Sequence, residues 1–175
     1  MTSESCKMRL ERYLREQGVE YEFEHHPLAY TARGVAASEH LLPSHVAKTV
    51  IVVAGGELCM VVLPASHDLH LTDLARELGV QTARLAGEAE FEPMFPDCEV
   101  GAMPPFGNLY GLLVFVDASL GKSESIVFEA GTYTDTMRVR YADFARLTNA
   151  QVIRAARERE LAGEWPDTTC LPTEA

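Results

Sequence analysis

Apolar runs and alternating stretches along the chain predict a domain of strands with interspersed helices. The segment at residues 45–53 contains five Val or Ile residues among nine, and β-branched side chains favour pleated, buried strands. Unbroken apolarity over residues 50–53 predicts burial on both faces and therefore a central strand. A glycine-containing turn at 54–57 and a second apolar run at 58–63 complete a predicted β-hairpin.

A second strand pattern lies near the N-terminus. Residues 19–24 alternate strictly between Val, Tyr or Phe and Glu, which is typical of a half-exposed strand. An amphipathic helix is predicted before it, beginning after Ser3 or Ser5 and ending before Gly18. Further helices are predicted at residues 32–40, 71–78 and 88–95, further strands at 112–117, 125–130 and 136–141, and helical segments beginning at Asp143 and Asn149.

These elements predict an α+β (mixed α/β) fold with a curved, largely antiparallel central sheet of about six or seven strands, flanked by helices. The chain shows neither an internal repeat nor a linker, so residues 1–160 are expected to form a single domain. Residues 161–175 are rich in Gly, Pro, Thr and acidic side chains, which predicts a loosely held C-terminal tail.

The charge balance narrows the choice of partners. The chain has 175 residues, of which 15 are Lys or Arg and 26 are Asp or Glu, giving a formal net charge of −11. Broad binding to a nucleic-acid backbone needs many cations facing phosphates, so DNA is not an expected partner. A small, local phosphate contact stays compatible with this charge. No apolar run approaches the ~20 residues that span a bilayer, and the N-terminus lacks an apolar signal core. A cytoplasmic protein without a membrane partner is expected.

Common catalytic and metal-binding motifs are missing from the sequence. The histidines lack the H-E-x-x-H form, and no C-x-x-C pair occurs among the four cysteines, Cys6, Cys59, Cys98 and Cys170. The sequence contains neither a G-x-S-x-G elbow nor a phosphate-binding P-loop. Neither a metal nor another cofactor is therefore expected.

The chemistry can instead involve Lys48 and the loop at residues 101–107. Lys48 stands where the chain enters the central strand, and an ammonium group fixed there can meet an anionic ligand. Gly101 permits close backbone approach, and Pro104 and Pro105 stiffen the loop, so its backbone groups can polarise a carbonyl or orient a water. The alternatives are a strand-end lysine that extends its charge into water and a tight crossover loop without a chemical role.

Three motifs, in order along the chain, resemble the YbaK/EbsC family. They are Ala47-Lys48-Thr49-Val50, the G-x-x-x-P element from Gly101 to Pro105 followed by Phe106-Gly107, and Phe128-Glu129-Ala130-Gly131-Thr132. Members of this family are aminoacyl-tRNA deacylases related to the editing domain inserted in bacterial prolyl-tRNA synthetases. The resemblance covers residues 21–147 and implies a YbaK-like fold.

The resemblance implies hydrolysis of the ester that joins a wrong amino acid to the 3'-terminal ribose of a tRNA. Lys48 would hold the terminal nucleotide, Gly101 would supply backbone groups near the scissile carbonyl, and Pro105 would fix the loop, without a metal. The implied partners are the 3' CCA end of a mischarged tRNA and an aminoacyl-tRNA synthetase. Such a hydrolytic sieve is useful because one methylene changes binding by only ~1–3 kcal/mol.

The remaining expectations concern the residues that bind the substrate and the alternative functions. The residues expected to bind the substrate are His45, Met103, Pro105, Phe106, Thr132 and Tyr133. Many relatives carry histidine where this chain has Tyr133, and a phenol with a reference pKa of ~10 is no base near neutral pH. A non-catalytic module that binds a tRNA end or a small ligand is therefore an alternative function. An unrelated metal-free esterase for small acyl esters is a third.

Overall fold

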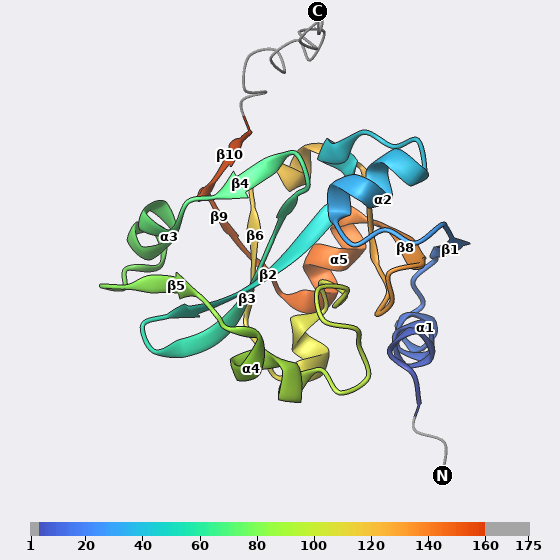
Figure 1. Cartoon of the computed structure of the whole chain (residues 1–175), viewed down its shortest axis with the longest axis horizontal. Coiled ribbons are helices and arrows are strands. Elements are labelled where there is room, and N and C mark those ends of the chain that lie inside the picture. The colour runs from blue at the N-terminus through green and yellow to red at the C-terminus, as the bar shows by residue number, and fades with distance from the viewer. Residues whose placement is uncertain (1–3, 160–175) are drawn as a thin grey trace, which may run out of the picture.

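The computed structural model describes residues 4–159, so the predicted tail at 161–175 lies outside the described residues. Figure 1 shows strands in the middle of the molecule with helices around them. The helices are α1 (Cys6–Glu16), α2 (Ala32–Ser38), α3 (Leu71–Leu78), α4 (Glu88–Phe91) and α5 (Tyr141–Thr148). The strands are β1 (Glu22–His25), β2 (Ala47–Ala54), β3 (Glu57–Pro64), β4 (His67–Leu69), β5 (Ala83–Leu85), β6 (Val114–Asp117), β7 (Ser125–Glu129), β8 (Asp135–Arg140), β9 (Gln151–Ile153) and β10 (Ala156–Glu158).

The predicted hairpin forms the centre of the largest sheet. Strands β2 and β3 pair antiparallel along their full length, from Ala47 opposite Pro64 to Ala54 opposite Glu57. The strand order of this sheet is β5-β2-β3-β6-β9. The pairs β3–β6 and β6–β9 are parallel, and the long connection within each pair contains both helix and further strands.

The α+β class is confirmed, but the predicted single sheet of six or seven largely antiparallel strands is wrong in detail. Within residues 4–159 the strands form three sheets, with orders β5-β2-β3-β6-β9, β1-β8-β7 and β10-β4. The four strands that the sequence did not predict, β4, β5, β9 and β10, have three residues each. A strand this short contains too few side chains to show an alternating pattern.

Two predicted elements need correction. Asn149 does not begin a helix: with φ of 50° it ends α5 in the left-handed conformation, and β9 follows. Asn adopts this conformation at helix ends more readily than most residues. The predicted strand at 19–24 begins only at Glu22, and Phe23 is 38% exposed beneath the Lys7 ammonium rather than buried in the core.

The corner between β9 and β10 depends on a buried carboxylate. Asp117, at the end of β6, is 3% exposed. Its Oδ1 accepts hydrogen bonds of 2.9 Å from the backbone N–H groups of both Ala155 and Ala156. Charge-assisted bonds of this kind are stronger than neutral ones. They hold the start of β10 beside the main sheet, and β10 leads directly to Arg159.

A small apolar cluster joins the two larger sheets beneath α2. Its members are Ala29, Val35, Ala36, Val46, Ala65 and Val127. Val46, just before β2, forms a parallel bridge with Val127 of β7. Side chains two positions further along each strand point to the same side, because side chains alternate with period two. This register brings Lys48 of β2 and Glu129 of β7 to one end of the cluster.

None of the helices within residues 4–159 is long and apolar enough to cross a lipid bilayer.

Candidate functional site

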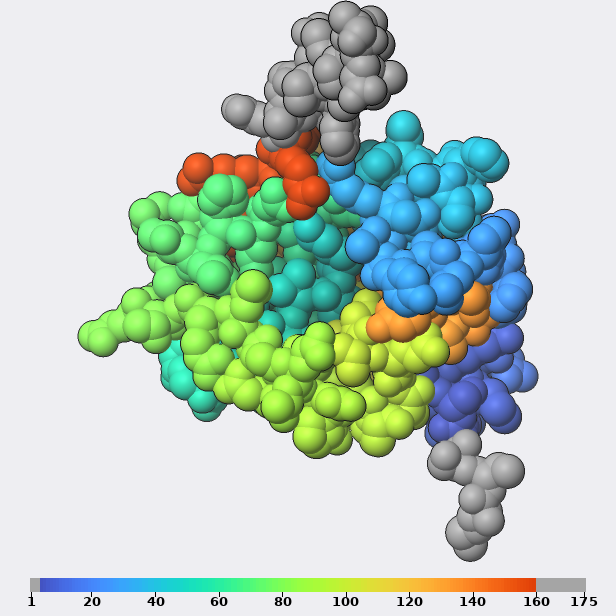
Figure 2. Space-filling view, viewed as in Figure 1, coloured from blue at the N-terminus to red at the C-terminus, as the bar shows by residue number. Residues whose placement is uncertain are grey.

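A cavity of about 490 Å³ opens at the end of this cluster. Figure 2 shows the hollowed face, where the teal surface of β2 is rimmed by α2 in blue and by the yellow-green loop that precedes β6. The lining residues are Tyr30, Thr31, Ala32, Arg33, Lys48, Thr49, Ala65, Gly101, Glu129 and Arg159. Lys48 and Gly101, which the sequence analysis expected to carry the chemistry, therefore line the same cavity.

Lys48 stands in a cationic part of this cavity. Its side chain is 25% exposed, and its Nζ lies 3.7 Å from Asp68 Oδ1. Asp68 in turn accepts two hydrogen bonds from the Arg159 guanidinium, at 2.9 and 2.5 Å, and the pKa of its carboxyl is lowered to about 2 chiefly by that bond. Burial lowers the pKa of the Lys48 ammonium, as do the neighbouring charges of Arg159 and Arg33. Three cations and one carboxylate thus surround this side of the cavity, an arrangement that can bind a phosphate.

The loop that carries Gly101 is braced from within. Gly101 has φ of +89°, which an L side chain rarely adopts. Glu99 N–H donates to Gly131 O at 2.8 Å, and Gly131 N–H donates to Ala102 O at 2.9 Å. The Gly101 N–H donates only to Met103 Sδ, at 3.2 Å, and a thioether is a weak acceptor. Within residues 4–159 the Gly101 carbonyl oxygen accepts no hydrogen bond. Both backbone groups can therefore serve a ligand.

Tyr133 does not line the cavity but packs beside two residues that do, Gly101 and Tyr30. A methyl group built on Gly101 would lie 3.9 Å from the Tyr133 ring, and the Tyr30 ring centroid lies 5.0 Å from that of Tyr133. The Tyr133 hydroxyl donates to the Val100 carbonyl oxygen. Burial and the charge of Glu99 raise the pKa of Tyr133. The phenol is therefore neutral and already engaged as a donor, which agrees with the expectation that it does not act as a base.

Like Tyr133, the other expected substrate-binding residues do not line the cavity. Met103 and Pro105 are buried behind the Gly101 loop, and Phe106 is fully buried in the main core, with its ring 5.5 Å from Phe128. Phe106, a residue expected to bind the substrate, packs in the core and supports the loop from behind. His45 is exposed, and Thr132 donates to Asp135 Oδ2 at 2.8 Å within a turn.

The sequence analysis missed Glu129 as a site residue. This glutamate lines the cavity and is only 8% exposed. Its Oε1 has no hydrogen-bond partner within residues 4–159. Burial, together with the charge of Glu99, raises the pKa of the Glu129 carboxyl to about 8. The sequence offered one indication of this role, an acidic residue at the end of an apolar strand. Because side chains alternate along a strand, Glu129 points to the face opposite that of Phe128.

Most of the chain matches one known protein family. A family model described as the aminoacyl-tRNA editing domain matches residues 26–147. The chain belongs to the aminoacyl-tRNA editing domain family. The matched range contains β2, the Gly101 loop and β7, so it includes most of the residues that line the cavity of this editing domain.

Solved structures share the fold of this editing domain. "Hypothetical protein APE2540" superposes with a TM-score of 0.77 at 20% identity, covering 85% of this chain and 99% of the other. A protein described as a "putative trans-editing enzyme for prolyl tRNA synthetase" gives a TM-score of 0.75 at 19% identity, covering 89% and 99% of the two chains. Among curated proteins, no sequence matches the chain significantly.

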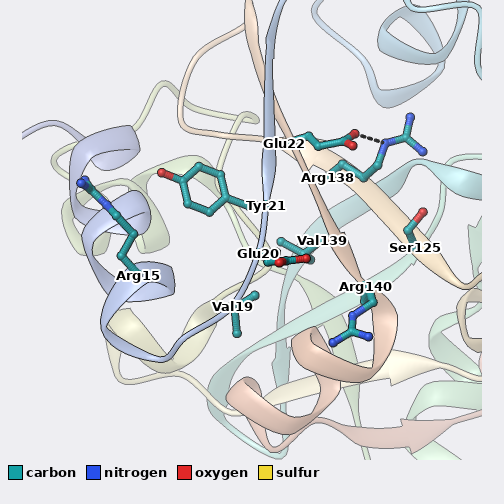
Figure 3. A pocket seen from close by; sticks show the side chains of 9 residues that line it. All are labelled: Arg15, Val19, Glu20, Tyr21, Glu22, Ser125, Arg138, Val139 and Arg140. Atoms are coloured by element: carbon teal, nitrogen blue, oxygen red, sulfur yellow. Dashed lines mark ion pairs between the residues drawn. The ribbon is translucent and has the colours of Figure 1, made fainter.

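A separate hollow of about 550 Å³ lies between α1 and the β1–β8 pair of the editing domain. Figure 3 shows the side chains that line this hollow. Among them, Arg138 and Glu22 form an ion pair, with 3.3 Å between Arg138 Nε and Glu22 Oε2. This hollow contains none of the residues expected to act in catalysis or substrate binding. Its size alone gives no chemical reason to prefer it over the cavity at Lys48.

The fold also brings two cysteines together that the sequence shows far apart. Cys6 Sγ and Cys98 Sγ lie 3.0 Å apart, and with Asp97 they form a group that could hold a metal ion. A structural zinc site commonly uses four ligands, whereas this group supplies three, and Asp97 already pairs with Arg9 at 3.7 Å. Sequence spacing could not reveal the contact, because 92 positions separate the cysteines.

Proposed function

We propose that this editing domain is a trans-editing aminoacyl-tRNA deacylase of the YbaK/EbsC type, a hydrolase that acts in the cytoplasm without a metal. Its reaction is hydrolysis of the ester that joins an amino acid to the 3'-terminal ribose of a mischarged tRNA. The observation that carries the proposal is the meeting of Lys48 and Gly101 in one cavity of a chain that belongs to the editing family. Residues 1–160 would form the catalytic domain.

Lys48 would bind the phosphate or ribose of the terminal nucleotide. Its ammonium lies at the cavity wall, and Arg33 and Arg159 line the same cavity. The 3.7 Å between Lys48 Nζ and Asp68 Oδ1 is long for a hydrogen-bonded ion pair. An incoming phosphate would therefore replace Asp68 in part as the partner of Lys48. The gain comes from pairing a partly desolvated cation with an anion.

The Gly101 loop would act on the ester itself. A water held by the Gly101 carbonyl oxygen can attack the ester carbon, while a backbone N–H of the loop stabilises the oxyanion that forms. The C–O bond to the ribose then breaks, and the ribose oxygen takes up the proton that the water loses. The products are the free amino acid and a tRNA with an intact 3' end. Met103 and Pro105 would hold the loop in this geometry.

The acidic surface limits how the tRNA is held. With a net charge of −11, contacts would be confined to the single-stranded CCA end, and a synthetase would hold the body of the tRNA. The dependence of log Kd on log salt concentration should then be shallow, with a slope corresponding to about one to three phosphate contacts. A slope corresponding to many neutralised phosphates would contradict confined binding.

A non-catalytic binding module is the second candidate, favoured by Tyr133 in place of the histidine of many relatives. The two functions separate in a panel of alanyl-, cysteinyl- and seryl-tRNA, each mischarged, together with an uncleavable aminoacyl-adenosine amide. A deacylase hydrolyses at least one ester of the panel. Binding of the amide without turnover of any ester would support the binding module instead.

A further inference from the structure

Glu129 lines the cavity but has no part in the proposed binding of a phosphate or in the proposed action of the Gly101 loop. Only 8% of Glu129 is exposed. Within the described residues 4–159, its Oε1 has no hydrogen-bond partner. A buried carboxyl without a partner is costly, and the cost is recovered when a donor or a cation reaches it. Because Glu129 lines the cavity, such a partner can come from a ligand.

The residues that line the cavity carry charges of both signs. Lys48, Arg33 and Arg159 are cations, and Glu129 is the acidic residue among those that line the cavity. Asp68, beside Lys48, is engaged by Arg159 and Lys48. A ligand that carries both an anionic and a cationic group would match this set of charges.

Glu129 also lies close to the chemistry along the backbone. Two residues after it comes Gly131, whose N–H and C=O both bond the segment from Glu99 to Ala102 around Gly101. Val46 forms an isolated parallel bridge with Val127, and Lys48 and Glu129 each lie two residues beyond it, on β2 and β7. A group bound by Glu129 would therefore sit next to an ester carbonyl held at Gly101.

We propose that Glu129 binds the α-ammonium group of the aminoacyl ester and so requires a free amine on the substrate. The inference rests on the proposed function. In an aminoacyl ester the carbon that carries the ammonium is bonded directly to the scissile carbonyl carbon, and the nucleotide phosphate lies on the other side of the ribose. The ligand thus offers a partner to both kinds of charge in the cavity, with its ammonium at Glu129 and its phosphate at the cations.

The test compares two forms of one substrate on two forms of the enzyme. A mischarged tRNA that the wild type deacylates is used with its amine free and with the amine N-acetylated, which removes the positive charge. Each is assayed with wild type and with Glu129→Gln, and Glu57→Gln, a change at an exposed glutamate in the β2–β3 turn region, is the control. Steric effects of the acetyl group act on both enzymes and cancel in the comparison.

In wild type, acetylation should lower kcat/KM about 10- to 100-fold, as expected for loss of a hydrogen bond to a charged group. In Glu129→Gln, kcat/KM for the free amine should fall by a similar factor, and the N-acetylated substrate should be hydrolysed within about threefold of wild type. Glu57→Gln should behave as wild type. Equal losses on both substrates in Glu129→Gln would assign Glu129 a structural role and overturn the inference while leaving deacylation intact.

A binding measurement separates this inference from the proposed function. Calorimetric titration with the uncleavable 3'-aminoacylamino-3'-deoxyadenosine and with its N-acetyl derivative needs no turnover. Tighter binding of the free amine by wild type, lost in Glu129→Gln, supports amine recognition even if no ester is hydrolysed. Indifference of wild type to acetylation overturns the inference, also in the event that Glu129→Gln does not fold.

Discussion

The pH dependence of stability should reveal the buried carboxyl of Glu129. Burial and Glu99 raise its pKa from 4.5 to about 8, so the folded protein holds this proton more tightly than the unfolded chain does. The folded state therefore loses stability as pH rises from about 4.5 to about 8, and the loss is complete above the folded pKa. Glu129→Gln has no proton to lose at this position. Its stability relative to wild type should increase with pH over this window.

The size of the effect follows from the shift. A pKa change of roughly 3.5, at about 1.36 kcal/mol for each unit, corresponds to about 5 kcal/mol between pH 4.5 and 9. Water in the cavity and the neighbouring charges of Lys48, Arg33 and Arg159 reduce this figure. A gain of about 2–4 kcal/mol for Glu129→Gln over wild type at pH 9, relative to pH 5, is therefore expected.

The assay is urea unfolding of wild type, Glu129→Gln and Glu57→Gln at several pH values between 5 and 9. The difference in unfolding free energy between Glu129→Gln and wild type is plotted against pH, which cancels titrations shared by both proteins. Glu57→Gln should give a flat difference, because that glutamate is exposed. A flat difference for Glu129→Gln as well would show that its carboxyl is solvated in the folded protein, and the reasoning from burial would fail.

Two further substitutions test the framework around the site. Gly131→Ala should destabilise the protein by about 3 kcal/mol or more, because φ is +96° and the new Cβ would lie 2.6 Å from Cys6 Cβ. The control is Gly18→Ala, where φ is +68° and the new Cβ would meet open space. This change should cost only about 1 kcal/mol. Equal costs in urea unfolding would argue against close packing at Gly131. Asp117→Ala should cost about 3 kcal/mol, because the buried N–H of Ala155 and the partly buried N–H of Ala156 lose their acceptor. Exchange of those two amides with deuterium should become faster. Unchanged exchange would contradict the role given to Asp117.

The sequence predicted best the elements whose side chains show their environment over many positions. The β2–β3 hairpin and α3, which ends before Gly79 in the left-handed conformation, follow from long apolar runs and a C-terminal glycine. The three-residue strand β10 depends instead on hydrogen bonds that the backbone N–H groups of Ala155 and Ala156 donate to distant Asp117. Such tertiary hydrogen bonds leave no periodic pattern in the chain.

The candidate site was predictable in part for a similar reason. Lys48 and Gly101 belong to motifs that can be matched in sequence, and both line the cavity. Arg159 reaches it only because β10 pairs with β4, which also carries Asp68. Glu129 is next to Phe128 in sequence, but its missing hydrogen-bond partner is a property of the folded surroundings. Side chains that meet through tertiary pairing could not be assigned before the fold was known.

The most direct test of the central claim is single-turnover deacylation of mischarged alanyl-, cysteinyl- and seryl-tRNA by wild type, Lys48→Ala and Lys122→Ala. Lys122 is exposed and lies outside the cavity, so its variant controls for the loss of one positive charge. The account predicts hydrolysis of at least one ester by wild type and Lys122→Ala, with Lys48→Ala folded but reduced to the rate of buffer alone. Equal turnover by Lys48→Ala and wild type, or no turnover of any ester by folded wild type, would contradict it.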